Sequence, residues 1–212
     1  MRQEAPISQT EFNPRKEPRQ ARARFTVDAI LDATARILVN DGYDRLTTNQ
    51  VARVAGVSVG SLYQYFPNKE SLVREVFARH ARGMLAMLAG AAGDLVGVPL
   101  EKAVRSYVHA MTVAYQANDA LDRVLMQQAL HLGVDHLQEV HDQAVAVVRL
   151  WLEQHKGSIL PTDLDTAAVV LVTACEAINH APALRGQKND HRNFETEMGN
   201  LILRYLRGSS AG

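Results

Sequence analysis

The sequence predicts an all-α protein. Aromatic residues make up 6% of the 212 residues, whereas Ala, Leu and Val are abundant and no Gly- or Pro-rich repeat occurs, a composition that favours helices. Apolar residues recur at helical spacing, and no stretch shows sustained period-two alternation between hairpin turns. The first amphipathic face consists of Val27, Ile30, Leu31, Thr34, Ala35 and Leu38.

The first two helices are predicted from their capping residues. The first is expected to begin at Thr26, a good N-cap, with Asp28 in the first turn, where the helix dipole favours a negative charge. Gly42 supplies its C-terminal stop. Thr47 and Gln50 have capping-box spacing and are expected to open a short second helix.

The next two helices are bounded by equally clear signals. Gly56 ends the second helix, and Ser58 is expected to cap a short third one. Pro67 closes that helix, and Asn68 can cap a longer fourth helix that runs to about Leu88. A glycine turn between two short helices is typical of a helix-turn-helix unit.

Beyond Gly93 the helical pattern continues, for about nine helices in all. The Val-rich segment 169–172 could form a buried strand in isolation, but its flanks continue at helical spacing. The intervening loops contain Pro99, Gly157 with Pro161, and Gly186. The five further helices are expected near residues 101–117, 120–132, 136–155, 163–184 and 190–207.

Cysteine usage and hydropathy restrict the setting. The single cysteine, Cys175, excludes an intrachain disulfide and metal sites built from cysteine clusters. The first twenty residues have no apolar stretch typical of a signal peptide. The most apolar window, 83–100, contains Asp94, Pro99 and four glycines, which makes it too broken for a membrane span, and 167–175 is too short. We therefore expect a cytoplasmic protein without a membrane partner, cofactor or metal.

The charges are unevenly distributed along a chain of zero net charge. Residues 1–85 hold 13 Lys and Arg against 9 Asp and Glu, and residues 86–212 hold 10 against 14. Residues 1–24 are expected to form a disordered basic arm, which contains Pro6, Pro14, Pro18, Arg15, Lys16, Arg19, Arg22 and Arg24. The asymmetry favours an N-terminal part that meets a polyanion; chance fluctuation is the alternative.

The string GVSVG, residues 56–60, matches the nucleophile-elbow pattern G-x-S-x-G of serine hydrolases, with Ser58 as the nucleophile. That chemistry needs a buried strand before the first glycine and a parallel sheet beneath the serine. The preceding residues, NQVARVA, are helical in pattern and place Gln50 and Arg53 at polar positions. The context therefore favours a helix cap over a nucleophile.

The third helix has two different faces on a helical wheel. Val59, Leu62, Tyr63 and Phe66 share one side, and Ser58, Gly60, Ser61, Gln64 and Tyr65 share the other. The second side carries small residues, hydroxyls and an amide, and no charge that would repel phosphate. Gln64 can make a bidentate hydrogen bond to adenine, and the hydroxyls can reach bases or phosphates. The alternative is a packing motif in which Ser58 is only a cap.

These motifs together resemble the TetR-type (tetracycline repressor-like) DNA-binding domain over roughly residues 24–84. They occur in order as G-Y/F-x-x-(L/T)-T, T-x-x-x-(V/I)-A, A-G-V-S-x-G-x-(L/I)-Y-x-Y-F and x-(N/S)-K-E-x-L. The resemblance implies a homodimer whose recognition helices enter successive major grooves of a palindromic operator. It implies a DNA-binding domain at 25–84, with its helix-turn-helix motif at 47–66, and a helical effector-binding and dimerisation domain at 85–212.

The resemblance also assigns DNA-contact roles to individual positions. It implies a phosphate contact for Thr48 and Lys69, base-facing positions for Gly60, Ser61 and Gln64, and phosphate- or base-contacting aromatics for Tyr63 and Tyr65; Leu62 and Phe66 are expected in the core. Val59 departs from the family pattern, which is often basic or polar here, so this position either loses a contact or reads a thymine methyl. A solvated surface side chain is the alternative for each.

The C-terminal part is expected to hold a small-molecule pocket and the dimer interface. Expected lining residues are Tyr107, Met111, Tyr115, Met126, Trp151, Cys175 and Asn179, with His109 and His180 as further choices, and ordinary core packing is the alternative. His131, His136 and His141 rotate around a helix and are weak metal candidates. The last two helices, with AAVVLVTAC and NLILRYL, suit a four-helix dimer interface.

The expected function is sequence-specific transcriptional regulation, most simply repression relieved by a small-molecule effector. A DNA-binding protein that takes no small effector is the alternative within this class. A serine hydrolase and a purely structural helical protein are the alternatives outside it. The sequence identifies neither the operator nor the effector.

Overall fold

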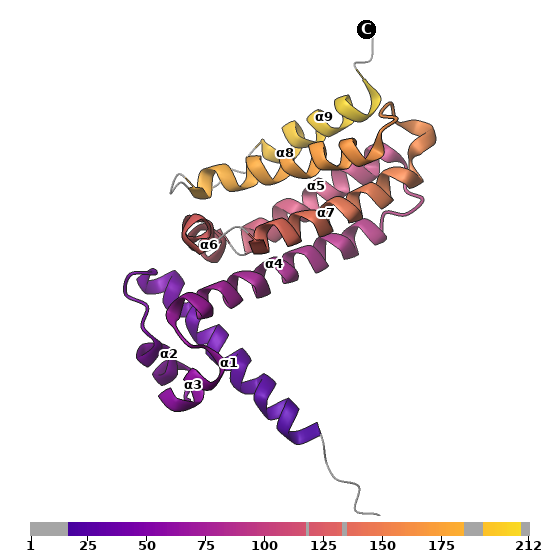
Figure 1. The fold of residues 1–212 in the computed structure, drawn as a ribbon. Helices are drawn as coiled ribbons and strands as arrows, with labels where there is room; N and C mark the ends of the chain where they lie inside the picture. The colour runs from indigo at the N-terminus through magenta and orange to yellow at the C-terminus, as the bar shows by residue number, and fades with distance from the viewer. Residues whose placement is uncertain (1–16, 118, 133–134, 185–192, 209–212) are drawn as a thin grey trace, which may run out of the picture.

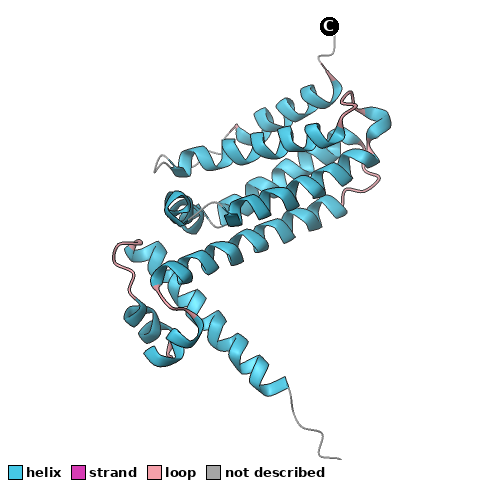
Figure 2. Cartoon of the chain, viewed as in Figure 1, coloured by secondary structure: helices cyan, strands magenta, loops and turns pink. Residues whose placement is uncertain are grey.

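The computed structural model describes residues 17–117, 119–132, 135–184 and 193–208. Within these ranges the chain forms nine α-helices and one short 3-10 helix, with no strand (Figures 1 and 2). The all-α prediction is therefore confirmed. The helices are α1 Glu17–Asp41, α2 Thr48–Ala55, α3 Val59–Tyr65, α4 Lys69–Gly93, α5 Leu100–Ala117, α6 Asp119–Leu132, α7 Asp135–Gln154, η1 Lys156–Ser158, α8 Leu164–Leu184 and α9 Phe194–Arg207.

The first helix begins earlier than its sequence signal suggested. Thr26 was expected as the N-cap, but α1 begins at Glu17, and the Thr26 hydroxyl donates to the carbonyl of Arg22 at 2.9 Å inside the helix. The segment 17–24 is rich in Ala, Arg and Gln, which are strong helix formers, and Pro18 is tolerated in a first turn. Residues 17–24 therefore belong to α1 and not to a disordered basic arm; residues 1–16 of the expected arm lie outside the described part.

The reversals between the short helices follow from glycine and hydroxyl chemistry. α1 ends before Gly42, and α2 ends at Gly56, whose φ of +71° lies in the left-handed region. The N–H of Val57 then donates to the carbonyl of Ala52 at 3.0 Å, which closes the helix end. The predicted capping box of α2 is only half formed, because Thr47 accepts from the Gln50 backbone while the Gln50 side chain donates to Asp41 at 2.8 Å.

Helix α4 connects the two halves of the molecule. Asn68 caps it by accepting from the Ser71 backbone at 2.8 Å, as expected, and Ser71 completes a capping box. The helix continues to Gly93, beyond the expected end near Leu88. The expected domain boundary between residues 84 and 85 thus falls inside a single helix, which leads from the α1–α3 unit to the stacked helices of the C-terminal part (Figure 1).

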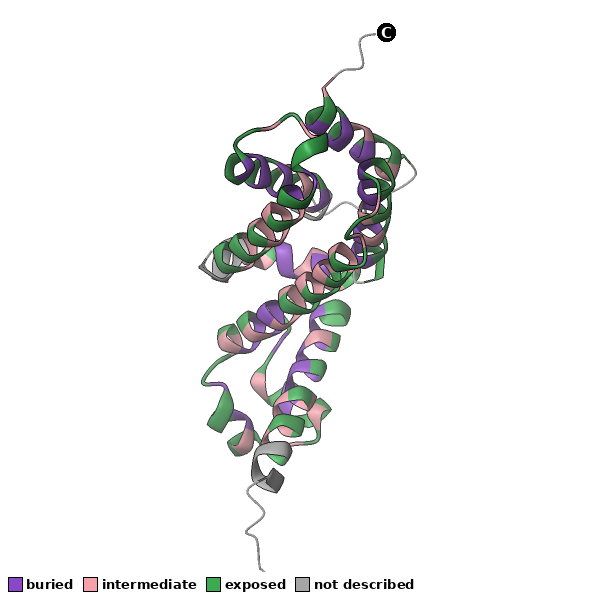
Figure 3. Cartoon of the chain, turned by 90° about the vertical axis from the view of Figure 1, so that its right-hand side faces the viewer, coloured by how far each residue is buried: buried purple, intermediate pink, exposed green. Residues whose placement is uncertain are grey.

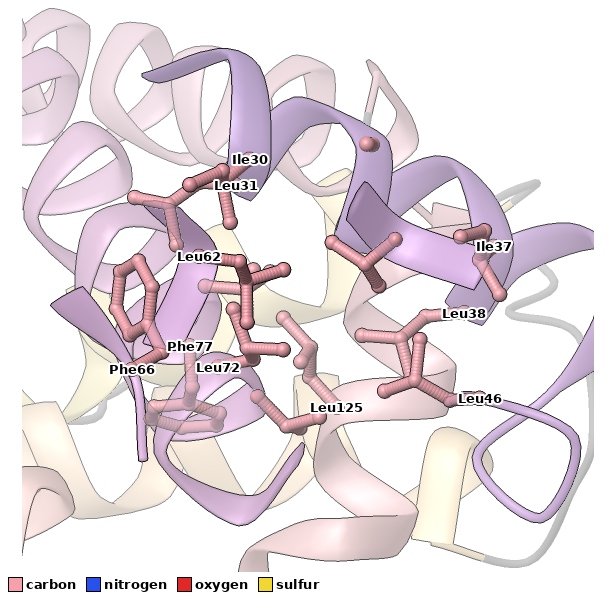
Figure 4. Packing of buried hydrophobic residues seen from close by; sticks show 14 of the residues in the cluster. Ile30, Leu31, Ile37, Leu38, Leu46, Leu62, Phe66, Leu72, Phe77 and Leu125 are labelled. Atoms are coloured by element: carbon pink, nitrogen blue, oxygen red, sulfur yellow. The ribbon is translucent and has the colours of Figure 1, made fainter. Parts of the chain in front are cut away.

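The N-terminal core is built from α1–α4 and completed by α6. Leu62 of α3 and Phe66, which directly follows that helix, lie in the core as predicted (Figure 4) and are 0% and 7% exposed. Leu125 and Met126 of α6 belong to the same cluster, although the nearest of its other buried members in the sequence is Phe77 of α4. Burying a leucine of this kind contributes roughly 1.5–3 kcal/mol, so α6 is part of the support of the helix-turn-helix unit.

The C-terminal core joins α5, α7, α8 and α9 through the buried sides of these helices (Figure 3). The bounds of α5–α8 agree with the expected ranges within one residue, and the Val-rich segment 169–172 lies within α8 and not in a strand. The last helix begins at Phe194, later than the expected residue 190, and residues 185–192 lie outside the described part. Among the described helices, none combines the length and the hydropathy that a bilayer-spanning segment requires.

We predict that Gly56→Ala lowers the free energy of unfolding by about 1–2 kcal/mol, because the left-handed backbone conformation is unfavourable for an L-residue. The loss would come from the backbone alone, since a Cβ at this position meets nothing within 4 Å. Urea denaturation measures this difference. Gly60→Ala is the matched control, since φ of Gly60 is not positive and a Cβ there meets only the Ser58 hydroxyl, at 3.9 Å. Equal losses in the two variants would contradict the assignment.

Candidate functional site

Helix α3 presents most of its side chains to solvent. Leu62 is its buried residue, and the exposed fractions of Val59, Tyr63 and Tyr65 are 39%, 50% and 40%. Gly60 and Gln64 are also exposed, and Ser61 is half-buried. Val59 and Tyr63 therefore do not lie on the buried side where the helical wheel placed them. The reason is the length of α3: seven residues anchored through Leu62 and the following Phe66 bury only a narrow stripe.

Two pairs of hydroxyls organise this exposed surface. The Thr48 and Tyr63 hydroxyl oxygens lie 3.0 Å apart and link the first turn of α2 to α3. The Ser58 hydroxyl accepts from the Ser61 backbone at 3.0 Å and lies 2.8 Å from the Ser61 hydroxyl. Ser58 is therefore the predicted N-cap, in an extended conformation of φ −70° and ψ 149°. No strand precedes it in the described chain, so the geometry of a nucleophile elbow is not formed.

Lys69 is positioned by an aromatic residue that the sequence-based assignment missed. Its ammonium lies 4.1 Å from the centre of the Tyr43 ring, a cation–π contact at the start of α4. The Tyr43 hydroxyl donates to Glu70 at 3.2 Å. Burial raises the pKa of Tyr43, and the negative charge of Glu70 raises it further. In the sequence Tyr43 is recognisable only as the aromatic residue of the G-Y/F motif, because its closeness to Lys69 depends on the fold.

Positive charge lies beside α3 and not on it. The helix sequence, VGSLYQY, contains no ionisable acid or base other than its tyrosines. Exposed arginines instead occur in α1, in the loop before α2 and in α2 itself: Arg22, Arg24, Arg45 and Arg53. This arrangement leaves hydrogen-bonding groups in the middle and charges in the flanking segments, the division of labour between base reading and phosphate binding in protein–DNA contacts.

A second candidate site is a cavity of about 500 Å³ in the C-terminal half, lined by side chains from α4 to α9. Six of the seven expected lining residues border it, namely Tyr107, Met111, Tyr115, Met126, Trp151 and Cys175. Asn179 does not: it is 2% exposed and its side-chain amide donates to the carbonyl of Cys175 at 2.8 Å, behind the lining. His180 borders the cavity, whereas His109 is exposed, 3.0 Å from Glu195.

Three polar pairs line this otherwise apolar cavity. His80 of α4 lies 3.4 Å from Asp122 of α6, and His141 of α7 lies 2.8 Å from Glu176 of α8. The Tyr115 hydroxyl lies 3.2 Å from Nε2 of His180. In the His80–Asp122 and His141–Glu176 pairs, the two residues come from different helices and are 42 and 35 residues apart in the sequence. Sequence periodicity gives no signal for contacts of this kind, so neither histidine–carboxylate pair was predicted.

Burial shifts the acid groups of the cavity. It raises the pKa of Tyr107 to about 12, with a smaller contribution from Cys175. It also raises the pKa of Tyr115, with contributions from the negative charges of Asp122 and Glu176. The pKa of the Cys175 thiol rises to about 11, first through burial and then through Glu176. All three groups are therefore neutral at physiological pH.

The histidines do not gather into a metal site in the part of the chain that the structure describes. No group of three or more His, Cys, Asp or Glu side chains with suitable geometry occurs there. His141 is paired with Glu176, and the side chains of His131 and His136 lie outside the described residues.

The outer side of α8 and α9 carries exposed apolar residues. They are Val169, Val170 and Ile178 from α8, and Leu201 and Tyr205 from α9. A shallow groove between the two helices is lined by Ile178, Phe194, Met198 and Leu201, together with polar neighbours. Ile178 and Leu201 meet at this groove, and exposed apolar side chains gathered in this way are typical of a contact with another protein chain.

Comparison with known families agrees with both halves of this architecture. Residues 30–76 match the family of bacterial regulatory proteins known as the tetR family. Residues 99–206 match the tetracyclin repressor-like C-terminal domain. The chain belongs to the TetR family. It is a DNA-binding transcriptional regulator; the family consists of regulators and not of enzymes.

Individual relatives of this TetR-family regulator are distant. The transcriptional repressor KstR2 of Rhodococcus jostii is 35% identical over 92 residues, which are 43% of this chain and 42% of that protein. The chain thus spans less than half the length of this relative. A putative TetR-family regulator from Mesorhizobium loti shares the fold with a TM-score of 0.70 at 20% identity, over 85% of this chain and 93% of the other.

A further structural neighbour is SmeT, solved as a complex with triclosan. Its TM-score is 0.66 at 18% identity, over 86% of this chain and 92% of that chain. At this level of identity the likeness shows the shared fold.

We predict that Cys175 of this regulator resists alkylation near neutral pH. Because only the thiolate reacts, a pKa of about 11 in place of the ordinary 9.0 makes the native rate at pH 8 about a hundredfold lower than in the unfolded chain. Iodoacetamide labelling followed by mass spectrometry measures the rate, since the chain has one cysteine. The native rate should climb about tenfold per pH unit between 8 and 10; a plateau above pH 9 would contradict the raised pKa.

Proposed function

We propose that this regulator is a repressor that binds a palindromic operator as a homodimer and leaves it when a small-molecule effector enters the C-terminal cavity. The observation that carries the proposal is the course of α4. Lys69 begins this helix beside the proposed recognition surface, and seven side chains between Phe77 and Ala92 of the same helix line the cavity. A bacterial operator lies in the cytoplasm, so the proposal places the protein there, acting without catalysis.

On the operator, α3 would lie in the major groove. Gln64 would read an adenine, and the absence of a side chain at Gly60 lets the helix approach the base edges closely. Ser61 and Tyr65 would contact neighbouring bases or phosphates, and Val59, which is exposed, would pack on a thymine methyl. Thr48, Ser58, Tyr63 and Lys69 would hold phosphates, with the Thr48–Tyr63 hydroxyl pair fixing α2 relative to α3.

The coupling between cavity and operator would run through side chains shared by both. Phe77 of α4 and Met126 of α6 belong to the buried core under the helix-turn-helix unit and also line the cavity. An effector that displaces either side chain therefore changes the packing under α1 and α3 directly. The effector needs to prefer one arrangement of α4 and α6 over another, which is the thermodynamic requirement for ligand control.

The proposed recognition surface is tested with two residues that have different roles, the exposed Gln64 and the half-buried Lys69. We predict that Gln64→Ala weakens specific operator binding by about 1–3 kcal/mol and relaxes preference at one base pair in each half-site. Lys69→Gln should weaken binding to every sequence and reduce the salt dependence of log K by about one. Fluorescence anisotropy with a palindrome from the gene's own upstream region measures both.

Both variants should melt at the wild-type temperature. If Gln64→Ala left sequence preference unchanged, the proposed base-reading face would be wrong. If wild-type protein bound no upstream palindrome, the proposed repressor function would fail.

The dimer is proposed to form through α8 and α9, whose exposed apolar side chains would pair with the same surface of a second copy. A two-fold pairing of two helices from each chain makes a four-helix bundle. It also fixes the spacing of the two recognition helices, which a palindromic operator requires.

We predict that Leu201→Glu converts the dimer to a monomer, because it places a charge in the middle of this apolar surface. Sedimentation velocity would show the change, and operator affinity would fall by roughly a hundredfold or more since the two half-sites are no longer linked. Met87→Glu is the matched control, as Met87 is similarly exposed, 44% against 48% for Leu201, but lies on α4. A dimeric Leu201→Glu variant would exclude this interface.

A further inference from the structure

The charged side chains that line the cavity are acidic, if the histidines are set aside. Asp122 and Glu176 line it, and no arginine or lysine is among the described lining residues. Asp122 is held in the interior, with a side chain only 6% exposed, and Glu176 is partly exposed at 32%. Burying a carboxylate without a fixed positive partner is costly, so a cavity of this kind favours an occupant that brings positive charge.

Both carboxylates influence the same buried side chain, Tyr115. Tyr115 is 7% exposed, and the negative charges of Asp122 on α6 and Glu176 on α8 both raise the pKa of its hydroxyl, after burial. They therefore approach one buried ring from two helices, with His180 hydrogen-bonded to the same hydroxyl. An occupant of the cavity beside Tyr115 lies within the field of both acids.

The partners of these acids are imidazoles and not guanidinium or ammonium groups. Asp122 is paired with His80 and Glu176 with His141. Unlike arginine, histidine is not a permanent cation. An entering anion would therefore meet two carboxylates and no permanent cation, whereas an entering cation would supply the fixed positive charge that the lining lacks.

The remaining surface suits a large hydrophobic group that carries delocalised or shielded charge. Aromatic rings line it from three helices, including Phe77, Tyr107 and Trp151, and the thioethers of Met84 and Met111 lie among them. Aromatic faces attract cations, and methionine side chains adapt to irregular ligands. A volume of about 500 Å³ lies in the range of pockets that take drug-sized molecules.

We infer that the effector is a hydrophobic organic cation, whose charge is neutralised by Asp122 and Glu176 and whose apolar body fills the space between the aromatic and methionine side chains. The inference rests on the proposed function only in taking this cavity as the effector site. Glu176 and Asp122 are then the residues that determine ligand charge, and the aromatic side chains determine ligand size.

Three probes of similar shape and different charge test the inference: tetraphenylphosphonium, tetraphenylborate and the neutral triphenylphosphine oxide. Trp151 is the only tryptophan of the chain and lines the cavity, so its fluorescence reports binding at this site. Tetraphenylphosphonium is expected to bind at least tenfold more tightly than the neutral probe, and tetraphenylborate more weakly than either. Equal or tighter binding of tetraphenylborate would overturn the inference.

Charge-removing variants locate the effect. Glu176→Gln and Asp122→Asn should each lower tetraphenylphosphonium affinity by about tenfold and leave the neutral probe unchanged. Glu139→Gln is the matched control, because this carboxylate is exposed on α7 and is not part of the lining. If neither lining variant changes the preference for the cation, the two acids are not its cause and the inference fails.

Operator release is measured separately, with the same probes and the anisotropy assay. A cation that binds beside Trp151 without releasing DNA supports the ligand class and contradicts the proposed release mechanism. An anion that binds and releases DNA supports the proposed release mechanism and contradicts the ligand class. If none of the three probes binds, both the effector cavity and its charge preference are wrong, while the operator-binding result stands independently.

Discussion

Burial of apolar side chains where α6 meets α1 and α4 is the interaction on which the rest of this molecule depends. Leu125 is fully buried there, against the helices that also hold Leu62 of α3. Removing a leucine from such a position costs about 2–5 kcal/mol, a large part of the stability of an ordinary domain. The same junction places Phe77 and Met126 between the helix-turn-helix core and the cavity. The packing of the helix-turn-helix core and the shape of the cavity therefore depend on the same few side chains.

The proposed recognition surface combines rigid backbone with permissive side chains. Glycine and hydroxyl caps fix the ends of α2 and α3 through local hydrogen bonds, so the backbone has little freedom to adjust. The exposed side chains on that backbone are short, or carry a single hydroxyl or amide, and those of Thr48 and Tyr63 restrain each other. Lys69 is restrained by the Tyr43 ring, which would reduce the entropy lost if its ammonium bound a phosphate, as proposed. The surface proposed to meet DNA is thus held in place by both backbone caps and side-chain contacts.

Sequence alone was sufficient where the determinant is local. Gly42, Gly56, Ser58 and Asn68 were placed correctly because each acts on backbone groups within four residues. It failed at Thr26, where good helix formers extend the helix past a suitable cap, and at Gln50, whose partner Asp41 lies in another helix. In the cavity, bulky apolar residues were recognisable from type and spacing. The pairs that include Asp122 and Glu176 depend on how the helices pack, which the periodicity of the sequence does not predict.

The participation of Leu125 in the N-terminal core limits how this protein can be recombined with others. A hybrid regulator that joined residues up to the end of α4 to a foreign effector domain would lose the side chain that closes the core from α6. The opening would have to be filled by whatever helix the new domain supplies, with its own shape and angle. A hybrid protein should therefore keep the helix-turn-helix segment together with α6, because these two segments are distant in the sequence but share one core.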